Sequence, residues 1–125
     1  NARVADIFDG FHPAVLRALK ITSTAGLNAN IPVALCGEMA GDPLAAVILV
    51  GLGFNELSMS SAALASVKRA LGAFNLLECR QLATKALASE SGENVLQLVG
   101  HAFMEKQLHL LVPPNLRESF EMEVS

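Results

Sequence analysis

The sequence predicts an α/β fold in which short parallel strands alternate with helices. Two segments, residues 31–36 and residues 54–59, are short and largely apolar, as buried strands are. Helical patterns precede, separate and follow these two segments. The resulting order of helix, strand, helix, strand and helix predicts right-handed βα units that pack on a parallel sheet.

The first helix is predicted to begin at Pro13, because proline suits the first position of a helix. Val15, Leu16 and Leu19 form an apolar stripe at helical spacing. Polar residues flank this stripe, so the opposite face of the helix is expected to meet solvent. Gly26 is the expected end of the helix.

The first strand is predicted at residues 31–36, between Asn30 and Gly37. Because this segment is almost wholly apolar, both of its faces are expected to be buried, as in a parallel sheet that helices cover. The second strand is predicted at residues 54–59, although two polar residues interrupt its apolar pattern. Two strands cannot close a sheet, since their outer edges expose unpaired backbone groups. Further strands are expected upstream in a longer protein, or from another copy of the chain.

The helix between the strands is expected over residues 43–50, with Asp42 as its N-cap and Pro43 at its first position. It is apolar nearly all round, which predicts that it packs between the sheet and another layer. Ser60 or Ser61 is expected to cap the helix that follows the second strand.

Beyond this point the sequence predicts only helices. Asn75 and Glu78 have the spacing of a capping box, which predicts the start of a helix there. A last helix is predicted from residue 95 to the proline pair that begins at Pro113. Residues 113–125 are acidic and are expected to form a flexible tail.

The composition narrows the possible functions. The chain has 125 residues and a net charge of −3, with no basic stretch that could follow a nucleic acid backbone. Its longest apolar run, residues 44–54, is shorter than the ~20 residues that cross a bilayer. Cys36 and Cys79 are too few for a disulfide framework, so a cytoplasmic location is expected. Because the chain opens without Met, we expect it to be a piece of a longer protein.

The residues that could carry chemistry lie near the end of the first strand. Cys36 is placed where α/β enzymes have their active sites, and its thiol could donate a proton or act as a nucleophile. A buried, inert cysteine is the alternative interpretation, and it is the expected one for Cys79. Glu38 could bind a cation or loop amides, or it could be an ordinary exposed carboxylate. Gly37 and Gly41 fit a loop in which the backbone approaches a ligand.

Several motifs in combination resemble one family. The sequence reads "LCGEMAGDP" at residues 35–43, "LVGLGFNELSMS" at residues 49–60 and "VKRAL" at residues 67–71. This combination resembles the C-terminal part of Enzyme I, the phosphoenolpyruvate–protein phosphotransferase of the bacterial phosphotransferase system. The Cys-Gly-Glu loop alone is shared with pyruvate phosphate dikinase and phosphoenolpyruvate synthase, whereas "ELSMS" favours Enzyme I. The nitrogen-related version is most similar in its opening, "HPAVLRALK" at residues 12–20, and the resemblance extends over residues 1–106.

The resemblance implies the C-terminal portion of a TIM (β/α)₈ barrel, followed by C-terminal helices. Residues 31–36 would be its seventh strand and residues 54–59 its eighth. Residues 1–112 would form the C-terminal part of the PEP-utilising barrel domain. The helices after Asn75 would match those near the dimer contact of the family, so a homodimer is expected.

The resemblance also implies a reaction. The family transfers the phosphoryl group of phosphoenolpyruvate to a protein histidine, uses Mg²⁺ and serves an HPr-like phosphocarrier protein. Its catalytic cysteine protonates the enolate that becomes pyruvate, and Cys36 matches that cysteine. Gly37 would bind substrate with Glu38 as a supporting loop residue, and Asn1 would lie beside an arginine that contacts the substrate. That arginine and the Mg²⁺ ligands are expected upstream of the chain, so no metal ligand is assigned within it.

Two functions are therefore compatible with the sequence. In the first, the chain is a fragment of the phosphotransferase, inactive alone, that supplies Cys36 as a proton donor. In the second, it is a non-catalytic module whose apolar helices, over residues 76–111, mediate dimerisation. Binding of phosphoenolpyruvate would distinguish the two.

Overall fold

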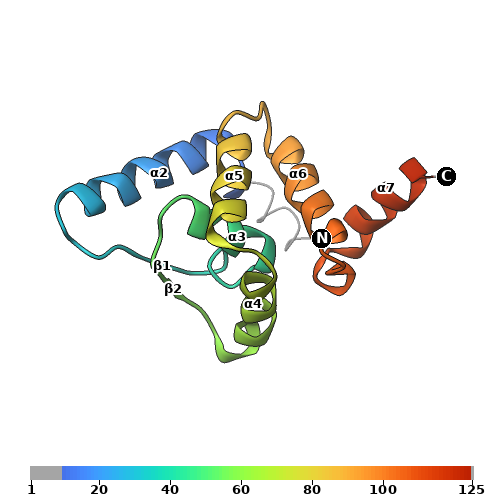
Figure 1. The fold of residues 1–125 in the computed structure, drawn as a ribbon, viewed down its shortest axis with the longest axis horizontal. Helices are drawn as coiled ribbons and strands as arrows, with labels where there is room; N and C mark the ends of the chain where they lie inside the picture. Colours follow the sequence, from blue (N-terminus) through green and yellow to red (C-terminus); the bar gives the residue numbers. More distant parts are fainter. Residues whose placement is uncertain (1–9, 125) are drawn as a thin grey trace.

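The computed structural model describes residues 10–124, with side chains described for residues 10–122. The architecture is α-rich with a small two-stranded sheet, and the elements follow the predicted order (Figure 1). In chain order they are α2 (Pro13–Asn28), β1 (Ala34–Cys36), α3 (Pro43–Gly51), β2 (Glu56–Ser58), α4 (Ser61–Ala73), α5 (Leu76–Leu87), α6 (Gly92–Glu105), a 3₁₀ turn (His109–Leu111) and α7 (Pro114–Val124).

The two strands form a parallel pair, as predicted, and α3 is the crossover between them. Parallel pairing needs such a crossover, because the second strand must start again at the edge where the first one started. The strands are paired residue for residue, with Ala34 opposite Glu56, Leu35 opposite Leu57 and Cys36 opposite Ser58.

Both strands are shorter than predicted, and the prediction that the first strand is buried on both faces is wrong. Each strand has three residues, against the predicted segments 31–36 and 54–59. Ile31 has an exposed fraction of 62%, and Ala34 and Cys36 are exposed as well. The reason is that no further strand flanks the pair in the described part of the chain, so the ladder is short and one face stays open.

Helix α3 forms the centre of the core. Its residues 43–49 are all buried, and α4, α5 and α6 pack around it (Figure 1). Asp42 Oδ1 accepts hydrogen bonds from the backbone N–H groups of Leu44 at 3.0 Å and Ala45 at 3.2 Å, which confirms the predicted N-cap. No helix within the described residues is both long enough and apolar enough to cross a membrane.

Helix α2 is attached to the core through hydrogen bonds to helix ends. Ser23 Oγ donates a buried hydrogen bond of 2.5 Å to the carbonyl oxygen of Leu52, just after α3. The Arg17 guanidinium donates one of 3.3 Å to the carbonyl oxygen of Leu87, the last residue of α5. Both carbonyls are groups that a helix terminus leaves without an intrahelical partner, so α2 satisfies them.

The start of α5 is joined to the end of α6 through one carboxylate. The Asn75 side chain accepts from the backbone N–H of Glu78 at 2.8 Å, and the Glu78 side chain accepts from that of Asn75 at 3.0 Å. The predicted capping box is therefore confirmed. Glu78 also pairs with Lys106 at 2.5 Å, and Lys106 lies 5.4 Å from the ring centroid of Phe74. The Asn75 hydrogen bond and then Lys106 hold the pKa of Glu78 below its usual value.

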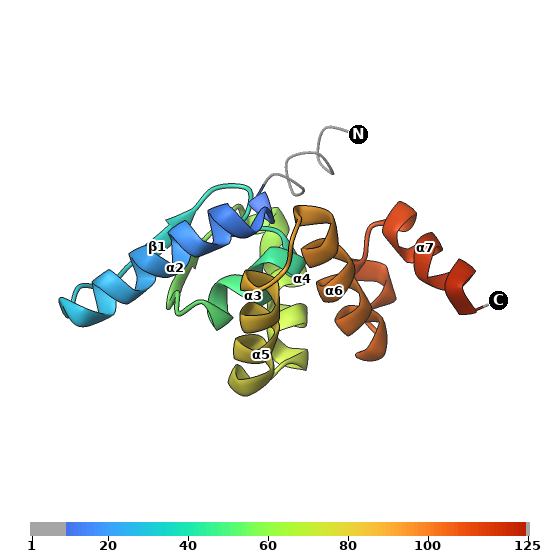
Figure 2. The same cartoon turned by 90° about the horizontal axis from the view of Figure 1, so that it is seen from above.

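The C-terminal part differs from the predicted single helix and flexible tail. Helix α6 ends before Pro113, since Gln107 has a positive φ of 61°, which an α-helix cannot continue through. The residues expected in the tail form α7, whose Leu116 and Phe120 are buried because their spacing places them on one face. They cover Gly100 on α6, where a Cβ atom would lie 2.7 Å from Leu116. Figure 2 shows α7 at the opposite end of the molecule from α2.

The close approach of α3 to α5 predicts that a larger residue at position 51, in place of Gly51, destabilises the protein. A Cβ atom at this position would overlap the carbonyl oxygen of Cys79 and lie 2.8 Å from Ala83 Cβ. We expect Gly51→Ala to lower the free energy of unfolding by ~1–3 kcal/mol, as overpacking of a core does.

Gly72→Ala is the matched control for this experiment, because Gly72 is also helical and an added Cβ atom meets nothing within 4 Å. It is expected to raise the free energy of unfolding by ~0.5–1 kcal/mol through helix propensity. Urea unfolding of the two variants measures the difference. Equal stabilities would show that α3 and α5 do not pack this closely.

Candidate active site

One face of the sheet carries side chains that stay exposed in the described part of the chain. They come from alternate positions of the two strands, so they point to the same side of the sheet. These residues, called the open face below, are Ala34 and Cys36 of β1 and Glu56 and Ser58 of β2. Leu35 and Leu57 point to the other side, where they are half-buried against the hydrophobic core.

Cys36 and Ser58 form the cross-strand pair at the carboxyl end of the open face. Neighbouring strands lie ~4.8 Å apart, so these two side chains stand beside each other. Cys36 is exposed, whereas Cys79 is buried. Burial, followed by the negative charge of Glu78, raises the pKa of the Cys79 thiol and disfavours its reactive thiolate. The inert interpretation therefore fits Cys79, and the exposed thiol is the one that can react.

A short loop leads from β1 to α3 and has a defined shape. Gly37 has a φ of 108°, which glycine adopts without strain. The Gly41 N–H donates a hydrogen bond of 3.2 Å to the carbonyl oxygen of Glu38, which closes a turn. Gly41 also packs against the residue after β2, since a Cβ atom there would lie 3.4 Å from Met59 Cβ. Asp42 then anchors the loop to the first turn of α3.

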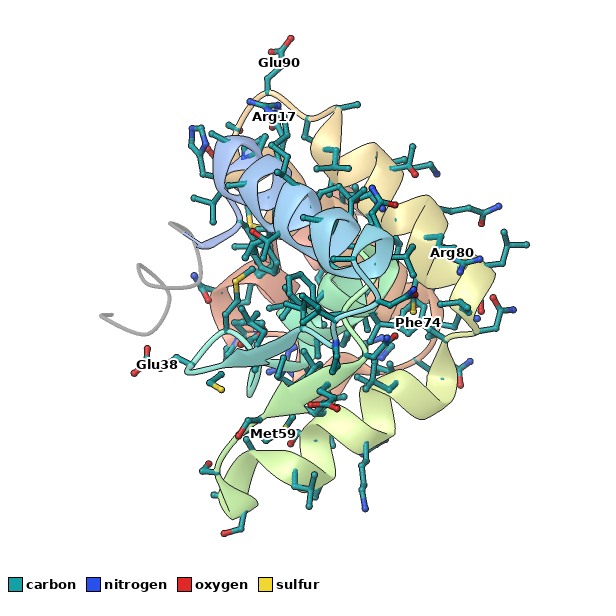
Figure 3. The ribbon with its side chains drawn as sticks, turned by 90° about the vertical axis from the view of Figure 1, so that its left-hand side faces the viewer. Arg17, Glu38, Met59, Phe74, Arg80 and Glu90 are labelled. Carbon is teal, nitrogen blue, oxygen red and sulfur yellow. The ribbon has the colours of Figure 1, made fainter. Side chains whose placement is uncertain are left out.

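The carboxyl ends of both strands meet at one edge of the sheet, as they must in a parallel pair. Figure 3 shows Glu38 and Met59, which follow the two strands, on the same side of the molecule and away from Phe74. Glu38 is exposed there, so its carboxylate contributes negative charge to this edge. A substrate placed at this edge would meet the Cys36 thiol directly.

Cys36, Gly37 and Glu38, which the sequence predicts for the site, follow one another at the end of β1 and the start of the loop, and all three are exposed. Asn1, also predicted, lies outside the described residues. Sequence reasoning missed that Ser58 stands next to Cys36. The signal was the alternation of polar and apolar residues around Leu57, which indicates a strand with one open face. The alternation alone does not show which residue of β1 lies opposite Ser58; only the strand register shows that it is Cys36.

The described residues 10–124 contain no group of three or more His, Cys, Asp or Glu side chains that could hold a metal ion. The open face itself carries a thiol beside a hydroxyl and the Glu56 carboxylate, and the adjacent loop adds the Glu38 carboxylate. Such a thiol can transfer a proton to a bound substrate or attack it as a nucleophile.

Comparison with known families matches residues 1–76, more than half of the chain, to the domain described as "PEP-utilising enzyme, PEP-binding domain". The matched part includes both strands of the sheet and the loop that joins β1 to α3. The open face therefore lies within the matched domain, whereas α5, α6 and α7 follow it almost entirely.

Relatives with curated names match a longer part of the chain. A protein named "Phosphoenolpyruvate-dependent phosphotransferase system" is 41% identical in Escherichia coli and 40% identical in Salmonella typhimurium, in each case over 107 residues, or 86% of this chain. A "Phosphoenolpyruvate-protein phosphotransferase" of Borreliella burgdorferi is 38% identical over 96 residues, or 77% of this chain. The matched segments span only 14% of the first two relatives' length and 17% of the third's.

The contrast between the two cysteines predicts selective alkylation. In the folded chain, iodoacetamide is expected to modify Cys36 at least ~100-fold faster than Cys79, because Cys79 is buried and its raised pKa disfavours the thiolate. Peptide mass spectrometry over time gives both rates. In denaturant the two rates should become similar, and Cys36→Ser should abolish the fast reaction. Equal rates in the folded chain would contradict the described burial.

Proposed function

The chain belongs to the family of PEP-utilising enzymes, among the phosphoenolpyruvate-protein phosphotransferases, and we propose that it supplies the proton donor of such an enzyme. Because it spans a small fraction of its relatives' length, we take the activity to be that of a longer protein that carries it. The 125 residues alone are expected to be inactive.

The proposed place of the chain is the C-terminal portion of a (β/α)₈ barrel, with β1 as the seventh strand and β2 as the eighth. The parallel pairing with a helical crossover supports this assignment. The open face supports it too, since a barrel strand directs alternate side chains inward and the others towards its helices. Residues 1–112 would belong to the barrel domain, and α7 would follow it.

The proposed reaction moves the phosphoryl group of phosphoenolpyruvate to a histidine on another domain. The bond between phosphorus and the enol oxygen breaks and a bond from phosphorus to the histidine nitrogen forms, which leaves the enolate of pyruvate. Cys36 then gives its S–H proton to carbon 3 of the enolate, a C–H bond forms, and pyruvate leaves. The thiolate regains a proton from water. From the histidine, the phosphoryl group would pass to an HPr-like phosphocarrier protein.

The observation that carries this proposal is the position of Cys36. Its thiol is exposed at the carboxyl end of a parallel strand, which is the side on which barrel enzymes bind their substrates. Gly37 has no side chain to obstruct a substrate, and we assign it to substrate binding. Glu38 is assigned a supporting role in the same loop, and Asn1 a contact with the substrate.

Mg²⁺ is the cofactor that the family resemblance implies for the longer protein. By the same resemblance, we assign its ligands to segments upstream of this chain.

The role of Cys36 is tested in the full-length protein that carries this chain. Cys36→Ala is expected to lower the rate of pyruvate release by ~100-fold or more, because general acid catalysis contributes that much. Cys79→Ala is the matched control, since Cys79 is buried away from the open face, and it should retain most of the activity. Near wild-type turnover of Cys36→Ala would refute the proposed role.

A second proposed function, dimerisation, is favoured by exposed leucines at the end of the matched domain and beyond it. Leu76 and Leu77 at the start of α5 have exposed fractions of 49% and 63%, and Leu110 in the 3₁₀ turn has one of 80%. Such side chains lose their contact with water when two copies associate. We therefore propose that these helices form a homodimer contact in the longer protein.

Sedimentation velocity at micromolar concentration tests the dimer. The full-length protein is expected to sediment as a dimer, and the double substitution Leu76→Glu with Leu77→Glu should shift it towards the monomer. Ile21→Glu on α2, with an exposed fraction of 70% for Ile21, is the control and should leave the dimer intact. A monomer before substitution would exclude this function.

A further inference from the structure

We propose that Ser58 is a positioning residue for Cys36, whose sulfur it holds through a hydrogen bond from the Ser58 hydroxyl. This inference rests on the proposed function, in which the Cys36 thiol gives its proton to an enolate. It adds a residue from the second strand to a site that otherwise comes from the first strand and its loop.

The strand register provides the geometry. Ser58 is the Cα partner of Cys36, and both side chains belong to the open face. With the strands ~4.8 Å apart, rotation of the two side chains about their Cα–Cβ bonds can bring the hydroxyl within hydrogen-bonding distance of the sulfur. Glu56 also shares this face, but it lies two positions back along β2, ~6.6 Å from Ser58.

The chemistry of the open face points to the same residue. When Cys36 gives up its proton, the sulfur becomes negatively charged, and a hydrogen-bond donor beside it stabilises that charge. Ala34 has no polar side chain, and an ionised Glu56 can only accept hydrogen bonds and would repel the thiolate. Of the other open-face side chains, Ser58 alone carries a donor. Before the transfer, the same hydroxyl can accept from the S–H group and orient the proton.

The proposed barrel adds a requirement for such a bond. If the open face becomes the inside of a closed barrel, the Ser58 hydroxyl leaves bulk water, and a buried hydroxyl without a partner is unfavourable. The neighbouring thiol is the partner that the register offers. Packing alone would be satisfied by alanine at this position, as it is at Ala34 on the adjacent strand.

The first test compares Ser58→Ala with Ser58→Thr in the full-length protein. Loss of one hydrogen bond to a charged group is expected to lower kcat for pyruvate release ~10-fold in Ser58→Ala, with KM for phosphoenolpyruvate changed less than ~2-fold. Ser58→Thr keeps the hydroxyl and should stay within ~3-fold of the wild-type kcat. Ser60→Ala is the matched control, because Ser60 precedes α4 without a side-chain capping bond, and it should leave kcat unchanged.

The second test detects the hydrogen bond between Ser58 and Cys36 without measuring catalysis. At fixed pH, alkylation of Cys36 by iodoacetamide should be ~10-fold slower in Ser58→Ala, because the thiolate loses its donor, and should recover in Ser58→Thr. A normal alkylation rate in Ser58→Ala, or a loss of kcat that Ser58→Thr does not restore, would overturn the positioning role.

Different results would refute the proposed role of Cys36 as proton donor and the proposed positioning role of Ser58. Full activity of Cys36→Ala would remove the proposed function, while the alkylation rates would still show whether Ser58 and Cys36 are paired. A large loss in Cys36→Ala together with normal kcat and normal alkylation in Ser58→Ala would retain the proposed function and remove the role of Ser58.

Discussion

Helix α3 has no polar side chain over residues 43–50, and the rest of the structure is arranged to keep it away from water. An apolar helix of this kind must be covered all round, because each valine, leucine or isoleucine side chain left in water forgoes ~1.5–3 kcal/mol of burial. Helices α4, α5 and α6 cover it, and Gly51 lets α5 approach the end of α3 almost backbone to backbone. Leu35 and Leu57 of the sheet add to the same core.

The site depends on this buried helix in two ways. Asp42 caps α3 and also ends the loop that begins at Gly37, so the position of the helix determines where the loop can run. The crossover through α3 also sets β2 beside β1 in parallel, which places Ser58 next to Cys36. The most buried helix of the described residues and the exposed thiol of Cys36 are therefore parts of one arrangement. In the proposed enzyme, that arrangement would hold the proton donor still while the phosphoryl group moves elsewhere.

Sequence reasoning succeeded where the determining interactions are local. The Asp42 cap and the capping box of Asn75 and Glu78 involve residues two or three positions apart, so their spacing was sufficient. It failed where the structure depends on contacts between residues that are far apart in the sequence. The burial expected for both faces of the first strand needs neighbours that the described residues do not contain. The packing of α7 depends on its close approach to Gly100, which is distant in the sequence.

For the candidate site too, the local part was predicted and the long-range part was missed. The motif around Cys36 located the loop, since Cys36, Gly37 and Glu38 are adjacent in the sequence. Ser58 lies far away along the chain, and only the pairing of the strands brings it to Cys36. A strand's own alternation tells which residues share a face, but it does not tell which residue of another strand stands opposite.

Glu78 links the local unfolding of the start of α5 to that of the end of α6. Its carboxylate takes part at once in a local interaction, the capping box of α5, and in a long-range one, the pair with Lys106 at the end of α6. The capping box and the ion pair therefore share one carboxylate, so each interaction helps to hold that carboxylate in place for the other. Fraying at the end of α6 weakens the first turn of α5, and fraying of that turn loosens α6. The opening of the two helix ends is consequently coupled, by the modest amount that a partly exposed ion pair contributes.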